Sequence, residues 1–323
     1  MTPKEWIEKY KSFLKDETIH RLLSNDGLPI NKFKSWTFLK LAVLYSYIHF
    51  IYLPHIGKNY ENPIYIDLFA GSGVSFDTEN KILYVGSPII AATNETSGYH
   101  FKKCIFVEKN EKYASALQQR LEILKNNDLI KCEMYTVITG DCNDPRIIRR
   151  VMNLIPRAKK HVMLFVDPYG IKFYKSTLDA FINKPYLYFD MFFNFQNHAA
   201  ARLIKKGTNT LTQLFGKKIW WAPCQDTNEK VYDCLLNRYI EMLKKEGKGK
   251  INTVMPIKVN SGMGYGYTLL FTTRKEDAEW LTGVNHLKDV AEELTGMTIT
   301  TLEKTTTLED FSDEKIKGDK AHT

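Results

Sequence analysis

The sequence predicts an α/β protein built on a doubly wound, mostly parallel β-sheet, and three observations point to it. From residue 64 onward, short apolar segments alternate with segments of helical periodicity. The apolar segments are continuous rather than alternating, which is typical of strands that helices bury on both faces. Two further strand-like segments follow late in the chain with a short turn between them. A short turn joins antiparallel neighbours, so we expect this late pair to be antiparallel.

The composition is that of a globular protein with an excess of cations. The 323 residues are 44% hydrophobic and 25% charged, and they suffice for one large α/β domain with additions or for two small domains. Lys and Arg number 45 against 37 Asp and Glu, a formal net charge of +8. A positive balance is compatible with a polyanionic partner such as nucleic acid but does not require one.

Residues 1–60 are expected to form a helical extension that packs against the sheet domain, because apolar residues recur at helical spacing between 39 and 51. The N-terminal stretch is amphipathic and of mixed charge, unlike a signal peptide. The longest apolar run, FLKLAVLYSYIHFIYL, is interrupted by Lys40 and His49, which argues against a membrane span. These features favour a cytoplasmic protein.

The sheet domain is expected to cover residues 61–300. Each of its first four strands precedes a helix, and the pairs are 64–69 with 87–95, 104–108 with 111–124, 133–139 with 144–155, and 161–167 with 175–182. A fifth strand over 186–195, a helical insertion over about 197–247, strands over 251–259 and 265–273, a helix from about 276 and a polar tail over 301–323 complete the chain. Five parallel strands with a late antiparallel pair are the strand inventory of Rossmann-like methyltransferases.

The five cysteines do not suggest a cross-linked or metal-bound scaffold. They are Cys104, Cys132, Cys142, Cys224 and Cys234. Their number is odd and none forms a CxxC pair, so we predict free thiols in a reducing compartment, without a disulfide framework or a structural zinc site.

The stretch IYIDLFAGSG, residues 64–73, indicates a small-molecule site. In open parallel sheets, ligands bind beyond the carboxyl ends of the strands, and this segment ends the first predicted strand. Gly71 and Gly73 are expected to let the backbone approach a ligand closely. The dehydrogenase fingerprint G-x-G-x-x-G is incomplete, because Phe76 stands where its third glycine would be.

The ligand is predicted to lack phosphates. No helix opens directly after the glycines, and the next helix signal is Ser87 as a cap followed by Pro88. No helix N-terminus therefore faces a pyrophosphate, which favours S-adenosylmethionine. Its ammonium group favours a carboxylate, which Asp67 can supply directly or through water.

Two further strand ends carry acids in the expected places. Glu108 ends the second strand and is placed to accept hydrogen bonds from ribose hydroxyls. Asp141 follows the third strand and can accept from the adenine amine, with Cys142 beside it. Phe69, in the glycine-containing loop, joins them as a candidate cofactor residue. The alternative is local capping, with Asp67 closing a turn, Glu108 capping the helix that follows it, and Asp144, or less readily Asp141, capping the next one.

The fourth strand ends in Asp167-Pro168-Tyr169-Gly170, and this tetrad resembles the motif of the amino-methyltransferases, [N/D/S]-P-P-[Y/F]. The resemblance implies that Asp167 and the carbonyl of Pro168 accept hydrogen bonds from a target exocyclic amine. It also implies that Tyr169 stacks on the base or walls the pocket. The aromatic residue comes one place early and glycine is last, a form similar to that of tRNA guanine-N2 dimethyltransferases. The alternative is a tight turn after a strand.

Over about residues 30–275 the chain also resembles the three-Cys-motif partner family (TcmP). The resemblance rests on KSWTFLKLAVLYSYI, YIDLFAGSG, GSPIIAA, VEKNEKYASAL, DCND, FVDPYG and YTLLFTT. It implies a methyltransferase-like fold and a neighbouring protein with three clustered cysteines, similar to radical enzymes, but not a particular methyl acceptor.

These observations lead to a principal hypothesis and competing ones. The principal one is an S-adenosylmethionine-dependent methyltransferase acting on an exocyclic amine of a nucleic-acid base. The second is a methyltransferase-fold partner of a three-Cys radical-type enzyme, in a defence or modification system, without its own turnover. The third is a methyltransferase for protein or small molecules. A nucleotide-using Rossmann enzyme comes last, because the third glycine is missing.

Overall fold

The computed structural model describes residues 17–33, 37–60, 62–77, 83–157, 160–204, 209–227, 230–260 and 266–297. The polar tail over 301–323, the first sixteen residues of the expected extension, and residues 261–264 of the expected turn over 260–264 lie outside the described residues.

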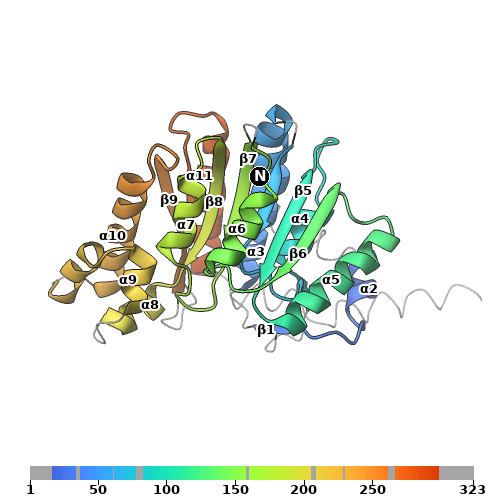
Figure 1. Cartoon of the computed structure of the whole chain (residues 1–323), viewed down its shortest axis with the longest axis horizontal. Coiled ribbons are helices and arrows are strands. Elements are labelled where there is room, and N and C mark those ends of the chain that lie inside the picture. Colours follow the sequence, from blue (N-terminus) through green and yellow to red (C-terminus); the bar gives the residue numbers. More distant parts are fainter. Residues whose placement is uncertain are drawn as a thin grey trace, which may run out of the picture.

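A seven-stranded sheet runs through the molecule, in the order β6-β5-β2-β7-β8-β10-β9 (Figure 1). Its strands are β2 (Ile64–Asp67), β5 (Lys103–Glu108), β6 (Met134–Thr139), β7 (Lys160–Val166), β8 (Leu187–Phe195), β9 (Thr253–Asn260) and β10 (Gly266–Thr273). β10 pairs antiparallel with both β8 and β9, and the other pairs are parallel. The expected doubly wound sheet with a late antiparallel pair is therefore confirmed, and it is a Rossmann-like methyltransferase fold.

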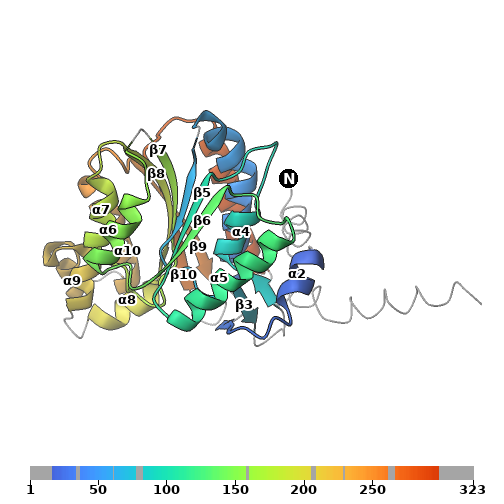
Figure 2. The same ribbon diagram turned by 45° about the vertical axis from the view of Figure 1, so that its right-hand side comes forward.

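Helices cover both faces of this sheet (Figure 2). One face carries α2 (Glu17–Leu23), α3 (Thr37–Ser46), the π-helix η1 (Tyr47–Ile56), α4 (Ser87–Thr93), α5 (Glu111–Asn126) and α11 (Trp280–Met297). The other carries α6 (Pro145–Asn153), α7 (Lys175–Ile182), α8 (Asn197–Ile204), α9 (Asn209–Phe215) and α10 (Val231–Glu246). Short 3₁₀ turns are η2 (Gly57–Asn59), η3 (Lys218–Trp220) and η4 (Ala222–Gln225).

The central strands are mostly apolar because both of their faces are covered. All four residues of β2 are buried, and successive side chains alternate between the two cores. Tyr65 packs in the core under α3 and α4, whereas Ile64 and Ile66 pack in the core under α6 and α7. Two faces of burial explain why the sequence shows continuous apolar runs here.

A second, three-stranded sheet was not predicted. Its strands are β1 (Asn31–Phe33), β3 (Val74–Asp77) and β4 (Leu83–Val85), in the order β1-β3-β4. β1 pairs parallel with β3, so the interpretation of residues 1–60 as helical is wrong at 31–33. The segment after the glycines, expected to be a loop, contains the antiparallel pair β3 and β4.

Buried polar contacts pin the N-terminal helices to the large sheet. The Tyr47 hydroxyl donates to Asp190 Oδ2 on β8 at 2.7 Å. The Tyr52 hydroxyl lies 3.1 Å from His161 Nδ1 on β7. Both tyrosines are fully buried, so the π-helix is part of the core.

The prediction of free thiols is wrong for two cysteines. Cys224 in η4 and Cys234 in α10 form a disulfide, with their Cα atoms 5.7 Å apart. They are 10 positions apart in the sequence, and no short motif marks the pair; folding of this helical region brings them together. Cys104, Cys132 and Cys142 are free and buried.

Among the described residues, no helix combines the length and apolar character needed to cross a membrane. In the same part of the chain, His, Cys, Asp and Glu do not gather in groups of three or more that could hold a metal ion.

Candidate ligand site at the carboxyl edge of the sheet

The acids singled out in the sequence lie at the carboxyl ends of adjacent strands. Asp67 ends β2, Glu108 ends the neighbouring β5, Asp141 follows β6, and Asp167 follows β7. Because β6, β5, β2 and β7 are adjacent and parallel, these four residues share one edge of the sheet.

Asp67 is fully buried and already has hydrogen-bond partners. Its Oδ2 accepts from the Ser87 hydroxyl at 2.6 Å, and its Oδ1 accepts from the backbone N–H of Phe69 at 3.0 Å. Ser87 therefore does not cap α4, whose N-cap is Gly86. Burial raises the pKa of Asp67 to about 7, against the opposing effect of these hydrogen bonds. This carboxyl group closes a turn, as the alternative interpretation expected, and its contact with a ligand stays a prediction.

The two glycines shape the loop after β2. Their φ angles are +63° at Gly71 and +83° at Gly73, a region that side chains other than glycine rarely adopt. A Cβ on Gly71 would lie 2.8 Å from Asn31 Nδ2, and one on Gly73 would lie 2.8 Å from Leu117 Cδ1. Protein atoms therefore face the Cβ side of both glycines, so a larger residue at either position would be strained and crowded, and the close approach of a ligand to this backbone stays a prediction.

Glu108 holds this loop to the end of β5. Its Oε2 accepts from the Gly71 N–H at 2.8 Å, and its Oε1 accepts from the Asn110 N–H at 2.7 Å. The N-cap of α5 is Asn110 and not Glu108, because the Asn110 side chain accepts from Lys112 and Tyr113. Each carboxylate oxygen keeps a further lone pair for a ligand hydroxyl.

Asp141 is half-exposed and paired. Its Oδ2 forms an ion pair with Lys109 Nζ at 2.9 Å, and its Oδ1 accepts from the Asn143 N–H at 2.9 Å. Burial acts to raise the pKa of Asp141, but the Asn143 N–H and Lys109 outweigh it and hold the pKa below its usual value. The N-cap of α6 is Asp144, so capping does not account for Asp141. Cys142 beside it is buried, and burial raises the pKa of its thiol.

Phe69 gives the edge a half-buried aromatic side chain. Its ring lies edge-on to that of Phe173, with centroids 6.5 Å apart. Phe69 and Cys142 are the apolar members of the predicted cofactor set.

The Asp167-Pro168-Tyr169-Gly170 segment begins where β7 ends. Asp167 forms an ion pair with Lys40 of α3 and accepts from Asn194 Nδ2 at 2.7 Å. The Pro168 carbonyl accepts from the Gln196 side chain at 2.8 Å. Tyr169 is 88% exposed, so its ring has a free face at the surface.

The sequence indicates no role for Lys40 or Asn31 at this edge, and it allows Asn194 only as a phosphate contact. Lys40 is 6% exposed and pairs with Asp167, and the sequence signal for it was a cation inside an apolar run. Asn31 on β1 and Asn194 on β8 each bury an amide oxygen that no group in the described part of the chain satisfies. A buried acceptor without a partner costs about 1–3 kcal/mol, so both mark places where a ligand donor is favoured.

Arg120 of α5 clamps the glycine loop to the N-terminal segment. Its guanidinium is fully buried and pairs with Asp26 at 2.7 and 3.0 Å. It also donates to the carbonyl oxygens of Pro29 at 2.9 Å, Ser72 at 2.7 Å and Leu28 at 3.2 Å. All sides of the guanidinium are thereby used, and the loop position depends on residues 26–31.

No protein-family model and no curated protein matches this sequence. The resemblance to the three-Cys-motif partner family therefore stays a prediction.

Several solved structures are similar in fold. An O-methyltransferase from Bacillus cereus in complex with SAH is 14% identical, over 84% of this chain and 100% of that one, with a TM-score of 0.43. The N-terminal domain of human METTL16 in complex with SAH is 15% identical, over 73% and 71%, with a TM-score of 0.38. Trm1 from Pyrococcus horikoshii with S-adenosyl-L-methionine is 12% identical, over 74% and 54%, with a TM-score of 0.39. Similarity this low carries no argument about activity; the fold assignment rests on the strand order and directions.

Proposed function

We propose that this protein is an S-adenosylmethionine-dependent methyltransferase that methylates an exocyclic amine of a nucleic-acid base. The observation that carries the proposal is the row of acceptor side chains at one edge of the sheet. Glu108, Asp141 and Asp167 stand at the ends of successive strands beside a glycine turn. A ligand with several donors suits this edge better than a phosphate does, because phosphate oxygens would meet carboxylates.

The residues present fit the cofactor. Glu108 offers acceptors for the ribose hydroxyls, and Asp141 offers one for the adenine amine. Phe69 and Cys142 supply apolar contact. The unsatisfied Oδ1 of Asn31, beside Gly71, is an acceptor suited to the ammonium group. S-adenosylmethionine supplies an activated methyl group when bound.

The methyl acceptor would be held by the segment after β7. Asp167 and the Pro168 carbonyl accept from the target amine, which orients its lone pair toward the methyl carbon. Lys40 and Asn194 fix the Asp167 carboxylate in place. The exposed ring of Tyr169 serves as a platform for a base, a contact typically worth about 1–3 kcal/mol.

The alternative is a partner protein of a three-Cys radical-type enzyme without its own turnover. Loss of the motif acids would favour it, yet Asp67, Glu108, Asp141 and Asp167 are all present. We therefore keep membership in the three-Cys-motif partner family as a proposal that is compatible with catalysis.

Calorimetry with S-adenosylmethionine tests the cofactor assignment. Glu108→Gln and Asp141→Asn keep the side-chain size and remove the charge, and Glu111→Gln on the exposed start of α5 is the matched control. We expect saturable binding in wild type and control, and at least tenfold (about 1.4 kcal/mol) weaker binding in both site variants. Absence of binding in wild type at millimolar ligand would refute the assignment.

Transfer of a labelled methyl group to RNA and to DNA then tests the acceptor. Asp167→Asn is expected to bind the cofactor as wild type does and to lose transfer, because the charge beside the target amine is gone. Transfer to nucleosides or proteins, but not to nucleic acid, would contradict the proposed acceptor and favour the small-molecule or protein alternative.

A further inference from the structure

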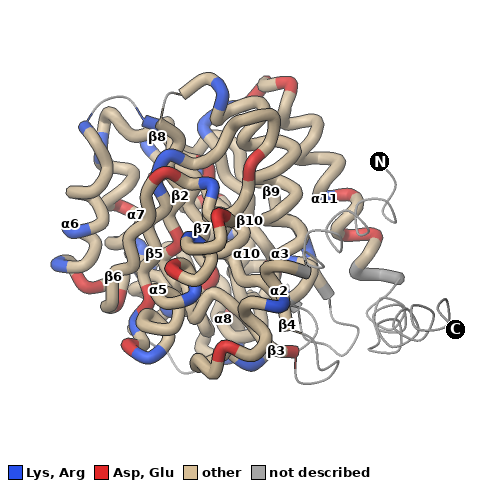
Figure 3. Tube along the Cα trace, turned by 90° about the vertical axis from the view of Figure 1, so that its right-hand side faces the viewer, with Lys and Arg blue, Asp and Glu red and all other residues tan. Residues whose placement is uncertain are grey.

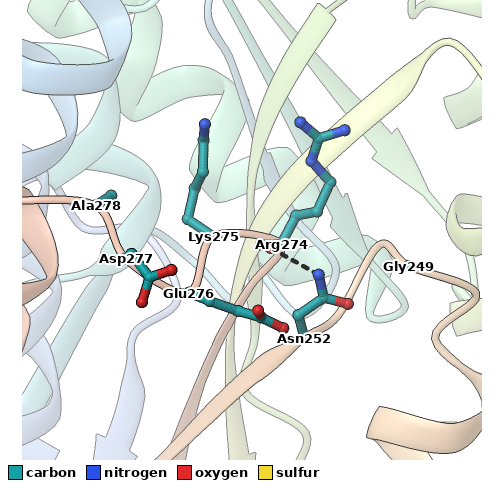
Figure 4. A pocket seen from close by; sticks show the side chains of 7 residues that line it. All are labelled: Gly249, Asn252, Arg274, Lys275, Glu276, Asp277 and Ala278. Atoms are coloured by element: carbon teal, nitrogen blue, oxygen red, sulfur yellow. Dashed lines mark hydrogen bonds between the residues drawn. The ribbon is translucent and has the colours of Figure 1, made fainter.

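A shallow polar cavity lies at the other end of the sheet, where β10 ends and β9 begins. Its volume is about 480 Å³. The lining residues are Gly249, Asn252, Arg274, Lys275, Glu276, Asp277 and Ala278 (Figure 4). Thr273 pairs with Thr253, which places Arg274 and Lys275 just beyond the strand end. The edge is opposite to the one that carries Glu108 and Asp167, because β8 starts here and ends there.

Two cations at this edge share one aromatic ring. The guanidinium carbon of Arg274 lies 4.3 Å from the ring centroid of Tyr188, and Lys250 Nζ lies 4.4 Å from the same centroid. Lys250 also donates to the carbonyl oxygens of Pro185 at 3.0 Å and Leu187 at 2.7 Å. Burial, and further the charge of Arg274, lower the pKa of Lys250, while Tyr188 acts in the opposite direction. Positive charge is therefore concentrated here.

In the part of the chain that the structure describes, this charge has no direct carboxylate partner. There, Arg274, Lys275 and Lys250 form no ion pair with a carboxylate. Glu276 and Asp277 line the same cavity, but in Figure 4 the side chains of Arg274 and Lys275 extend in one direction and the two acids in another. Figure 3 marks the Lys and Arg positions of the described chain in blue and the Asp and Glu positions in red. We call Lys250, Arg274 and Lys275 the basic edge.

We propose that the basic edge binds the phosphate backbone of a nucleic acid. Arginine presents a planar fork that matches phosphate oxygens, and lysine adds a point charge. Bringing a phosphate between like charges relieves their repulsion, which is the gain that the unpaired cluster offers. The net charge of +8 favours the approach of a polyanion.

The inference rests on the proposed function only in taking the bound nucleic acid to be the substrate. β8 has nine residues, so at about 3.3 Å per residue the two edges lie roughly 30 Å apart. At 3.4 Å per base pair, a duplex needs about nine base pairs to reach both edges. The basic edge would therefore select long or folded nucleic acids over short ones.

Binding is measured with a labelled RNA of about 20 nucleotides and a duplex of about 20 base pairs, between about 50 and 200 mM salt. The test variant is Arg274→Gln with Lys275→Gln, and Lys250 is left intact because it holds two backbone carbonyls. The control is Lys125→Gln with Lys131→Gln, which removes the same charge from exposed positions near the far edge strand β6. Thermal unfolding and cofactor calorimetry on each variant verify the fold separately.

We expect the test variant to lose at least tenfold in affinity, and the slope of log affinity against log salt to fall by about 2, one for each lost phosphate contact. The control should retain the wild-type slope. Equal slopes in test variant and control, or no binding by wild type at low salt, would overturn the proposal even if the cofactor binds. Inorganic phosphate or a mononucleotide competing as well as the long probes would also overturn it, in favour of a small-anion site.

Discussion

Replacing Asp67 with asparagine should change how stability depends on pH. Burial raises the pKa of this carboxyl group from 3.8 in the unfolded chain to about 7 in the folded protein. Between these values the folded state keeps a proton that the unfolded state has lost. Stability therefore falls as the pH rises through this window, and it is constant above the folded pKa. Asparagine does not ionise, so the variant lacks this loss.

The size of the effect follows from the two pKa values. One pKa unit corresponds to about 1.4 kcal/mol, so ionising Asp67 in the folded protein costs about 4 kcal/mol across the window. Asparagine keeps one acceptor oxygen, for the Phe69 N–H, and its NH2 group can donate to the Ser87 hydroxyl oxygen in place of the bond that Ser87 donates in wild type. Between acid and neutral pH, the free energy of unfolding of Asp67→Asn should thus rise by about 4 kcal/mol relative to that of wild type.

Urea denaturation at a series of pH values from about 4 to 8 measures the difference between the two proteins. Other titrating groups cancel in this difference. His161 is one of them, because burial lowers its pKa, and the stability that its neutral form contributes is lost as the pH falls. The exposed-acid variant Glu111→Gln serves as a control for the removal of a surface carboxylate. A difference that varies by less than about 1 kcal/mol over this range would refute the account of Asp67 as a buried, costly carboxylate.

Three further substitutions probe the site. Arg120→Met should destabilise the fold by about 3–5 kcal/mol in urea denaturation, because it leaves Asp26 buried without its cation. Adding Asp26→Leu should recover part of this loss, and a cost of Arg120→Met below about 1 kcal/mol would contradict the clamp. Tyr169→Ala should change the free energy of unfolding by no more than about 0.5 kcal/mol, since the ring is exposed. It should nevertheless lower kcat/KM for a nucleic-acid substrate about tenfold, whereas Tyr169→Phe should retain activity. Lys40→Met should leave the cofactor affinity measured by calorimetry unchanged while lowering kcat at least about tenfold, and Lys40→Arg should partly restore kcat. A loss of cofactor affinity as large as the loss in kcat would show that Lys40 is merely structural.

The sheet was predictable from the sequence because burial on two faces leaves a continuous apolar signature. β7 and β8 show it clearly, and the late pair β9 and β10 follows from the short turn between them. The small sheet was not predictable, since β1 and β4 have three residues each and β3 has four. Strands this short lack a period of their own and form only when their partners are in place.

The candidate site was predictable in position but not in detail. Strand ends placed Glu108 and Asp167 at one edge, because parallel strands share their carboxyl ends. The partners of these acids come from distant segments, as Lys40 does for Asp167, and no local spacing encodes such pairs. The local sequence predicts that Ser87 caps a helix, whereas in the folded protein its hydroxyl donates a hydrogen bond to Asp67.

The Arg120 clamp also bears on how the chain is made. Asp26 precedes Arg120 by 94 positions, and ribosomes add about 5–20 residues per second, so roughly 5–20 s separate the synthesis of the two partners. During that interval the Asp26 carboxylate stays hydrated, and residues 26–31 lack the Arg120 guanidinium that holds them in the folded protein. The glycine loop is likewise synthesised well before the guanidinium that anchors its Ser72 carbonyl. The loop that the proposed cofactor would contact is therefore completed only after α5 has left the ribosome, so a nascent chain gains its binding edge late.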